Sequence, residues 1–286
     1  MNTIVPAIAP SFAINRLSSI LAAEVIGLDL RKPLDRPTQE AVYQAFLQYQ
    51  LLVFRGQALG KEQQIAFTGQ FGTLEKHMPC NQGSDLSLLH VVSNLDERGV
   101  PTGVLGSTRW HSDKSFRAAP SMATVLHAVQ LPPEGGDTCF ANMYRAWETL
   151  PVAIRAELEG VRVVHSWALS RDNAGKIISE AERLDAPPMS HPLARPHPDT
   201  GRRALFVGAH ASHLEGLPLA PGRARIEALE THATHPSNVY QHRWAPGDVI
   251  MWDNRCLLHR ALPNFDAAAH ARVLHRTCLR GTPTSE

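Results

Sequence analysis

The spacing of apolar residues along the chain follows two different periods. A period of three to four residues, which predicts amphipathic helices, occurs over residues 36–50, 61–71, 143–160 and 222–234. The first segment has Thr38 as a candidate N-cap and leads into LLVFRGQ at 51–57, which predicts a strand ended by glycine. The third is interrupted at Pro151 and ends at Gly160. All four helices are expected to be structural.

Seven further runs are rich in β-branched and other apolar residues and are bounded by Pro, Gly or Asp. They predict strands within residues 121–131, 161–167, 203–210, 238–244, 247–252, 256–262 and 271–281. Several short strands of this kind are typical of a β-sandwich or a jelly roll. The chain is therefore expected to be mostly β with flanking helices.

Two long segments, 76–109 and 170–199, are polar, rich in Gly, Pro, Asp and Ser, and only weakly periodic. This composition predicts surface loops, and long loops in a compact domain often serve as lids over a site. With 286 residues the chain is long enough to bury a substantial core. We therefore expect a single domain over residues 1–286, with lid-like insertions near these two segments.

Charge is nearly balanced, with 28 Lys and Arg against 27 Asp and Glu and a net charge of +1. Such a chain has no strong field that draws it to nucleic acid or to an anionic membrane, so a small molecule is the expected partner. Its cysteines form no C-x-x-C pair, which fits neither a disulfide framework nor a zinc ribbon. We expect the cysteines to be reduced, and the sequence shows no basic targeting segment and no run of 18 apolar residues. These features predict a cytoplasmic protein without a membrane span.

The stretch WHSDKSF at 110–116 places His111 and Asp113 two residues apart. On a strand both side chains would project to one side and Ser112 to the other, which suits two ligands of one metal and disfavours a Ser-His-Asp triad. Taken alone, H-x-D is more often a simple His–Asp hydrogen bond. In MWDNRCLLHRAL, His259 offers a third ligand, whereas Cys256, three residues earlier, would face away. Two imidazoles and one carboxylate are the ligand set of non-haem Fe(II) oxygenases, although a zinc hydrolase could use the same residues.

Thr138, in GGDT, and Arg272, near the C-terminus, extend this pattern to four parts. Between Asp113 and Thr138 lie 24 residues, between Thr138 and His259 lie 120, and between His259 and Arg272 lie 12. This order and spacing resembles the Fe(II)- and 2-oxoglutarate-dependent dioxygenases of the taurine and 2,4-dichlorophenoxyacetate (2,4-D) dioxygenase family. The similarity covers most of residues 25–281, through LLVFRGQ, EQQIAF, FGTLE, WHSDKSF, GGDT, GAHASHLEGLP, GDVIMWDNRCLLHRA and a terminal R-x-x-x-R. GAHASHLEGLP is most similar to the 2,4-D branch.

The resemblance implies a double-stranded β-helix (jelly roll), with Fe(II) as cofactor and with 2-oxoglutarate and O2 as co-substrates. It assigns metal binding and catalysis to His111, Asp113 and His259. It assigns the distal carboxylate of 2-oxoglutarate to Thr138 and Arg272. These two roles suit the residues, since an arginine fork can hold a carboxylate through two parallel hydrogen bonds and a hydroxyl can donate another.

Arg276 stands four places after Arg272, and the resemblance implies that it binds the carboxylate or sulfonate of the substrate. On an extended strand the two guanidinium groups would share a face about 13 Å apart, at about 3.3 Å per residue, which suits two separate anions. Similarity to the 2,4-D enzymes implies that one of His210 and His213 lines the substrate pocket. His77 occupies the neighbourhood in which taurine enzymes have a substrate-contacting histidine.

Together these implications predict a dioxygenase that hydroxylates a small anionic substrate, an aryloxyalkanoate-type carboxylate, and cleaves its ether bond as in 2,4-D degradation. Taurine or another alkylsulfonate and alkyl sulfates are the alternative substrates. From other classes, a Zn-dependent hydrolase on the same triad and a non-catalytic binder of small anions remain open. The protein is expected to be a homo-oligomer without nucleic-acid or membrane partners.

Overall fold

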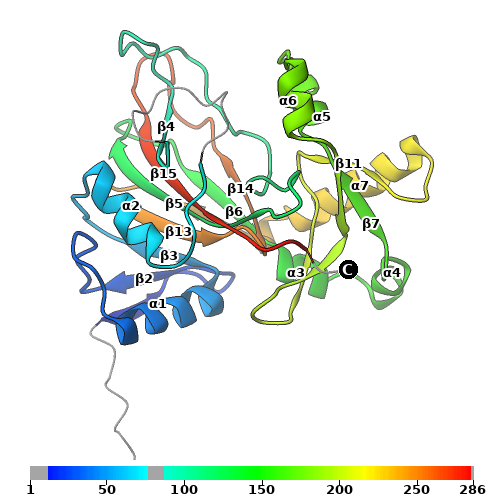
Figure 1. The fold of residues 1–286 in the computed structure, drawn as a ribbon, viewed down its shortest axis with the longest axis horizontal. Coiled ribbons are helices and arrows are strands. Elements are labelled where there is room, and N and C mark those ends of the chain that lie inside the picture. The colour runs from blue at the N-terminus through cyan, green and yellow to red at the C-terminus, as the bar shows by residue number, and fades with distance from the viewer. Residues whose placement is uncertain (1–11, 77–86, 285–286) are drawn as a thin grey trace, which may run out of the picture.

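The largest element of the fold is a seven-stranded sheet with the strand order β1-β2-β3-β13-β5-β15-β4 (Figure 1). The computed structural model describes residues 12–76 and 87–284. In the order of the sheet, the strands span Ala13–Arg16, Ala23–Ile26, Leu51–Phe54, Val249–Asp253, Ser121–Gln130, Val273–Arg280 and His90–Ser93. Neighbouring strands are antiparallel except β2 and β3, which run parallel.

A second, three-stranded antiparallel sheet packs against one face of the large sheet. Its order is β12-β6-β14, and its strands span Val239–His242, Thr138–Asn142 and Leu257–Ala261. Val53 and Trp252 of the large sheet share one buried apolar cluster with Phe140 on β6 and Leu258 on β14. The rings of Trp252 and Phe140 lie 5.4 Å apart in an edge-on contact. The two sheets therefore enclose an apolar core between their facing side chains.

Two helices, α1 (Arg36–Tyr49) and α2 (Lys61–Gly69), cover the other face of the large sheet (Figure 1). Phe46 and Phe67 of these helices share a second apolar cluster with Phe54 of β3. Val53 and Phe54 are neighbours in the chain but face different layers, because successive strand residues point to opposite sides.

The N-cap of α1 is Asp35, not Thr38. The Asp35 carboxylate accepts a hydrogen bond of 2.8 Å from the Thr38 amide, and Thr38 itself lies inside the first turn. An aspartate at this position satisfies an amide at the helix start that has no partner within the helix. The helix therefore begins where the apolar period starts, earlier than a cap at Thr38 would place it.

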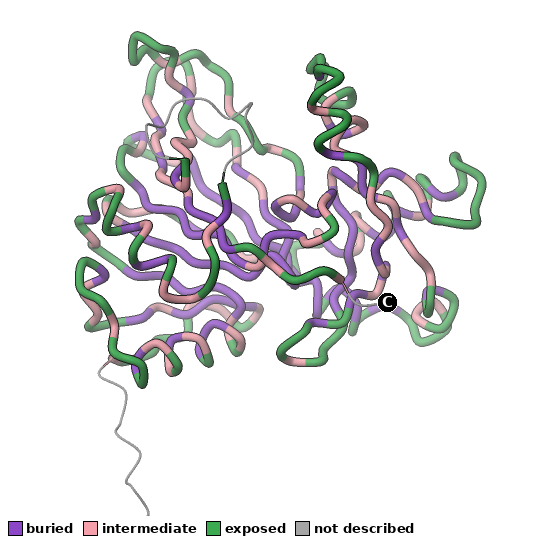
Figure 2. The backbone as a smooth tube through the Cα atoms, viewed as in Figure 1, coloured by how far each residue is buried: buried purple, intermediate pink, exposed green. Residues whose placement is uncertain are grey.

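The rest of the chain forms a smaller assembly beside the two sheets. It contains a three-stranded sheet in the order β11-β7-β8 and a two-stranded sheet of β9 and β10, which span Ala211–Leu214, Arg162–His165, Met189–Pro192, Ala194–Pro196 and Arg203–Leu205. The helices of this part, α3 to α7, and the short 3-10 helix η1 span Met143–Glu148, Val152–Glu157, Trp167–Asp172, Glu180–Asp185, Leu219–Ala233 and Pro236–Asn238. Helices α5 and α6 project away from it (Figure 1). Helix α6 is mostly exposed, whereas most residues of α5 are partly buried (Figure 2).

The structure confirms a strand-rich chain with flanking helices, and each of the seven predicted runs contains a strand. The reading of 76–109 and 170–199 as loops is wrong in part. The first contains β4, which pairs with β15, and the second contains α6, β8 and β9. Strands β4 and β8 are short and form by pairing with strands distant in the sequence, so their own periodicity is weak. None of the helices in the described ranges is long and apolar enough to cross a bilayer.

Candidate active site

His111 and His259 come together because their backbones pair. The amide of each donates to the carbonyl of the other, over 3.0 and 2.8 Å, and the two imidazole rings lie 4.2 Å apart. On the other side, the Ala209 amide donates to the Trp110 carbonyl, and a Cβ at Gly208 would lie only 3.4 Å from the His111 Cα. The segment that carries His111 is therefore held tightly between β14 and residues 208–209.

Asp113 reaches the same point by a turn rather than by a continuing strand. The bridge to β14 involves His111 only, and a turn begins at Asp113, next to the left-handed residue Lys114. The Ser112 hydroxyl points away and donates to the Asn254 carbonyl over 2.7 Å. The opposite directions of Ser112 and its neighbours were predicted, but the extended backbone was not correct beyond Ser112.

The three side chains form a compact group of potential metal ligands. One ligand atom from each of His111, Asp113 and His259 lies within 4.8 Å of the others. The Nε2 atoms of His111 and His259 lie 3.9 and 4.0 Å from the two oxygens of Asp113. Bonds of about 2.1 Å from a central ion would bring such a group together with small side-chain movements.

The protonation of the group fits a metal ion. His111 Nδ1 lies 2.9 Å from the Arg109 carbonyl, which can only accept, so Nδ1 carries the proton and Nε2 presents a lone pair. Burial, together with His111, lowers the pKa of His259 to about 3. Burial opposes the charge of Asp113, but Arg276 and the two histidines outweigh it and hold the pKa of this carboxyl well below its ordinary value. The group thus offers the Nε2 atom of His111, a neutral imidazole from His259 and the carboxylate of Asp113.

Arg272 forms a second feature beside this group. Its side chain is buried, with Nε donating to the Gly136 carbonyl over 2.8 Å and Nη2 donating to the Thr138 hydroxyl over 3.2 Å. Within the described ranges, no carboxylate forms an ion pair with it, and burial lowers its pKa to about 10, partly offset by Asp137. The Thr138 hydroxyl also accepts from Trp244 Nε1 over 3.0 Å, so its own proton is free to donate. A buried cation with a free hydroxyl donor beside it is a site for an anion.

Glycine and asparagine residues shape this anion site. Gly136 has φ +69°, and a Cβ there would lie 3.2 Å from Arg272 Cδ and Nε. Asn264 accepts from the Gly136 amide over 2.9 Å, and Asn94 accepts from the Arg272 amide over 2.7 Å. The two asparagines fix the backbone on both sides of the guanidinium, and residue 136 must be glycine for the Arg272 side chain to lie there.

Both features open into one cleft of about 700 Å³. Residues 104–109 line one side of it, and α5 with the residues that follow lines another. Among the described lining residues Asp113 is the only carboxylate, whereas the cationic ones are Arg109, Lys114, Arg171, Lys176, Arg272 and Arg276. This excess of positive charge favours small anions.

Comparison with known proteins agrees with this geometry. Residues 13–278 match the family model described as taurine catabolism dioxygenase TauD, TfdA family. This chain belongs to the TauD, TfdA family. It is therefore a member of a family of 2-oxoglutarate-dependent dioxygenases that use Fe(II), as the resemblance in the sequence indicated.

Individual members of the TauD, TfdA family are similar over nearly the whole chain. The 2,4-dichlorophenoxyacetate dioxygenase of Cupriavidus pinatubonensis is 41% identical over 94% of this chain and 98% of its own. The (S)-phenoxypropionate dioxygenase of Sphingobium herbicidovorans is 35% identical over 97% of this chain and 98% of its own. The crystal structure of AAD-2 with Mn(II) and N-oxalylglycine superposes with a TM-score of 0.87 at 35% identity, covering 96% of this chain and all of that one.

The remaining residues singled out in the sequence lie in different places relative to the TauD, TfdA site. Arg276 lines the cleft, where Nη1 lies 3.4 Å from an Asp113 oxygen while its buried Nε has no partner within the described ranges. His210 also lines the cleft, with its ring 6.2 Å from that of His111. By contrast, His213 is not among the lining residues, and its Nδ1 lies 2.8 Å from the Ser212 hydroxyl. His77 lies outside the described residues.

Sequence reasoning missed the residue that holds the Asp113 turn in this TauD, TfdA chain. Asn254 follows β13, and its side chain accepts from the amide of Asp113 over 3.3 Å and donates to the Thr124 hydroxyl over 2.9 Å. Thr124 in turn donates to the Asp113 carboxylate over 2.6 Å. The sequence signal for this role is an asparagine directly after a buried strand, within the motif GDVIMWDNRCLLHRA.

A second group of buried side chains, His197, Asp253 and Cys256, also brings potential metal-ligand atoms within 4.8 Å of one another. His197 Nδ1 accepts from the amides of Asp199 and Thr200 over 3.1 and 3.3 Å, so its proton is on Nε2, which donates to Asp253 over 2.9 Å. Burial, together with Asp253, raises the pKa of the Cys256 thiol well above its usual value. Neither the protonated ring nitrogen nor the thiol is a metal donor in this state. The group is a structural hydrogen-bond network.

Replacing Asp253 by asparagine should therefore destabilise the fold without removing metal. Burial opposes the Asp253 charge, but Arg255 and His197 outweigh it and hold its pKa well below the ordinary value. Losing one partner of a buried ion pair costs about 3 kcal/mol. Because the folded pKa is depressed, this contribution is present above about pH 4 and is lost as the pH falls further. Denaturant unfolding at pH 7 and pH 3 measures it, and an equal loss at both would contradict the assignment.

Proposed function

We propose that this dioxygenase hydroxylates an aryloxyalkanoate-type carboxylate at the carbon that bears the ether oxygen. Hydroxylation there gives a hemiacetal, which collapses with cleavage of the ether bond. A phenoxyacetate would yield a phenol and glyoxylate. The names of the similar dioxygenases, which act on 2,4-dichlorophenoxyacetate and (S)-phenoxypropionate, support this class of substrate.

In this proposal His111, Asp113 and His259 would hold Fe(II) as a set of two imidazoles and one carboxylate, the ligand set of non-haem Fe(II) oxygenases. When bound, the iron supplies the activation of O2, coupled to the oxidation of 2-oxoglutarate to succinate and CO2. One observation carries the proposal. These three donors converge beside a buried arginine, Arg272, which has no carboxylate partner in the described ranges.

Arg272 and Thr138 hold the distal carboxylate of 2-oxoglutarate. The Arg272 fork already donates to two neutral acceptors and has no anion beside it within the described ranges, and the Thr138 proton is free. A five-carbon dicarboxylate that chelates a metal through its keto end leaves its second carboxylate to be buried and paired. Pairing with a permanently charged fork stabilises that buried anion.

Arg276 binds the carboxylate of the substrate. It lies beside Asp113, but the contact of 3.4 Å is long and its buried Nε has no described partner, so the fork has donors left for an anion. The Arg276 fork lies beside the triad in the same cleft, so a carboxylate bound to it would place the adjacent carbon of the substrate close to the three residues that would hold the iron.

In this proposal, on a single domain over 1–286, the described residues of the lid-like insertions near 76–109 and 170–199 act as lids. Residues 104–109 and 170–176 both supply lining residues of the cleft, so closing them over it would exclude water from the reaction. The seven-stranded sheet and the three-stranded sheet β12-β6-β14 would be the two walls of a double-stranded β-helix. A homo-oligomer stays a prediction.

Oxygen uptake and succinate formation with phenoxyacetate, phenoxypropionate, taurine and an alkyl sulfate test this function. We expect turnover with the aryloxyalkanoates. Replacing Arg276 by glutamine should raise the KM for phenoxyacetate roughly a hundredfold, because a charge-assisted pair is lost, with little change in the KM for 2-oxoglutarate. Arg280→Gln, an exposed arginine on the same strand, is the matched control. Turnover of taurine alone would overturn the proposed substrate, and the reverse pattern of KM values would exchange the roles of Arg272 and Arg276.

A further inference from the structure

Three rings form one wall of the cleft next to the metal group. Phe116 lies 4.9 Å from Trp167 and 5.0 Å from His210, and Trp167 lies 6.0 Å from His210, measured between ring centroids. All three residues line the cleft. They come from separate parts of the chain. Phe116 lies in the turn that begins at Asp113, which is called the metal turn below, Trp167 begins α5, and His210 precedes β11.

The wall and Arg276 stand at different ends of the metal group. His210 contacts His111, with 6.2 Å between the ring centroids, whereas Arg276 contacts Asp113. A substrate that places its carboxylate on Arg276 and extends across the group therefore reaches the three rings. Aromatic rings in edge-on or offset contact attract a further ring beyond the effect of buried area alone.

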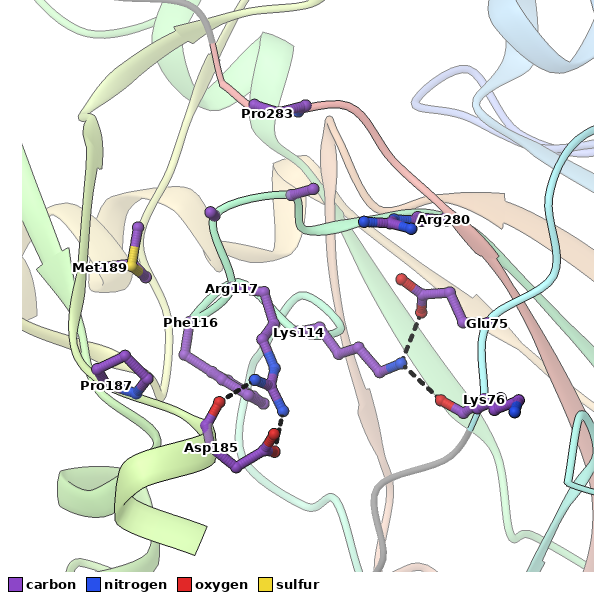
Figure 3. A pocket seen from close by; sticks show the side chains of 12 residues that line it. Glu75, Lys76, Lys114, Phe116, Arg117, Asp185, Pro187, Met189, Arg280 and Pro283 are labelled. Carbon is purple, nitrogen blue, oxygen red and sulfur yellow. Dashed lines mark hydrogen bonds and ion pairs between the residues drawn. The ribbon is translucent and has the colours of Figure 1, made fainter.

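Phe116 also separates the cleft from a second cavity. That cavity has a volume of about 630 Å³ and shares Lys114 and Phe116 with the cleft as lining residues (Figure 3). The backbone around Phe116 is fastened on both sides, because Lys114 pairs with Glu75 over 2.8 Å and Arg117 pairs with Asp185. The Phe116 ring is thus a fixed partition between two spaces.

This partition is not part of either main core. Phe116 is only 2% exposed, yet it packs in a small separate cluster with Ala186 and Trp167. The wall is therefore set by a few contacts between the metal turn and the segment of α5 and α6. Changing one ring should alter the cleft without disturbing the packing between the sheets.

We propose that Phe116 is the residue that determines substrate specificity: with Trp167 and His210 it holds the aryl ring, and it limits the cleft to substrates with one ring. This inference rests on the proposed function and deepens it. An anionic substrate with a single aromatic ring, joined through a short linker, fills the space between Arg276 and the wall. A second ring that extends past the wall on the side of Phe116 meets this side chain, which lines both the cleft and the neighbouring cavity.

The test compares kcat/KM for phenoxyacetate, 4-phenoxyphenoxyacetate and the non-aromatic butoxyacetate in the wild-type enzyme, Phe116→Leu, Phe116→Ala and Trp167→Leu. Both leucine variants should lower the ratio of phenoxyacetate to butoxyacetate roughly tenfold, through loss of the ring contact. Phe116→Ala should in addition raise the ratio of 4-phenoxyphenoxyacetate to phenoxyacetate at least about tenfold. Ratios are used because damage to the metal turn would lower kcat/KM for all three substrates together.

Phe71→Leu is the matched control, since it removes a partly buried ring on the helix-covered face of the large sheet and should leave both ratios unchanged. If Phe116→Ala does not fold, the tenfold loss in Phe116→Leu and Trp167→Leu decides the proposal. Unchanged ratios in both leucine variants would overturn it. If the wild-type enzyme turned over butoxyacetate but not phenoxyacetate, the role of Phe116 would be overturned while the dioxygenase activity would stand. If none of the three substrates gave succinate, the proposed function itself would be contradicted.

Discussion

Replacing Asp113 by asparagine should lower succinate formation by on the order of a thousandfold, because the only carboxylate among the described lining residues is lost. A metal ion supplies several kcal/mol of stabilisation to such a reaction, and each 1.36 kcal/mol is about tenfold in rate. The carboxamide has the same shape but no charge, so it binds Fe(II) weakly. Metal content after anaerobic loading with Fe(II) should fall with the activity.

Asp253→Asn is the matched control for this variant. Both aspartates are buried beside a histidine and an arginine, but Asp253 belongs to the structural network with His197. The Asp253 variant should lose stability and keep its iron, whereas the Asp113 variant should lose its iron. Equal iron content in the two variants would show that the metal does not bind at Asp113.

The second large effect concerns Arg272. Arg272→Gln should raise the KM for 2-oxoglutarate roughly a hundredfold or more, because truncating one partner of a buried, hydrogen-bonded charge pair costs about 2 to 5 kcal/mol. The KM for the aryloxyalkanoate should change much less. Initial rates at varied 2-oxoglutarate and fixed, saturating substrate measure the effect.

A smaller change at the same site provides the internal comparison. Gly136→Ala leaves the guanidinium in place but sets a Cβ 3.2 Å from its Nε and strains a backbone at φ +69°. It should raise the KM for 2-oxoglutarate about tenfold and destabilise the fold by about 1 to 2 kcal/mol. A KM for 2-oxoglutarate that is normal in both variants would place the co-substrate elsewhere.

The linear pattern predicted α1 to α4, α7 and the candidate metal group, but it missed α5 and α6 and much of the local backbone. The sequence was sufficient to select His111, Asp113 and His259, because a two-residue spacing and the order of motifs can be read directly from it. Strand β6 was missed, since its residues Thr138–Asn142 follow a glycine turn and carry little alternation of their own. It forms because β12 and β14 pair with it on both sides.

The parts of the site that depend on distant contacts could not be predicted from spacing. Asn254 reaches Asp113 across 141 positions, and Asn94 reaches Arg272 across 178. His210 and His213 are equivalent in the sequence, and only the structure places one in the cleft and the other outside it. The aromatic wall likewise joins three segments with no shared motif.

Anaerobic titration of the protein with Fe(II) and 2-oxoglutarate tests the central claim most directly. We expect a weak visible charge-transfer band that requires both additions, saturates at one iron per chain, and is absent from the Asp113→Asn variant. A band that persists in that variant, or no band at saturating concentrations of both, would contradict binding of iron and 2-oxoglutarate at His111, Asp113 and His259.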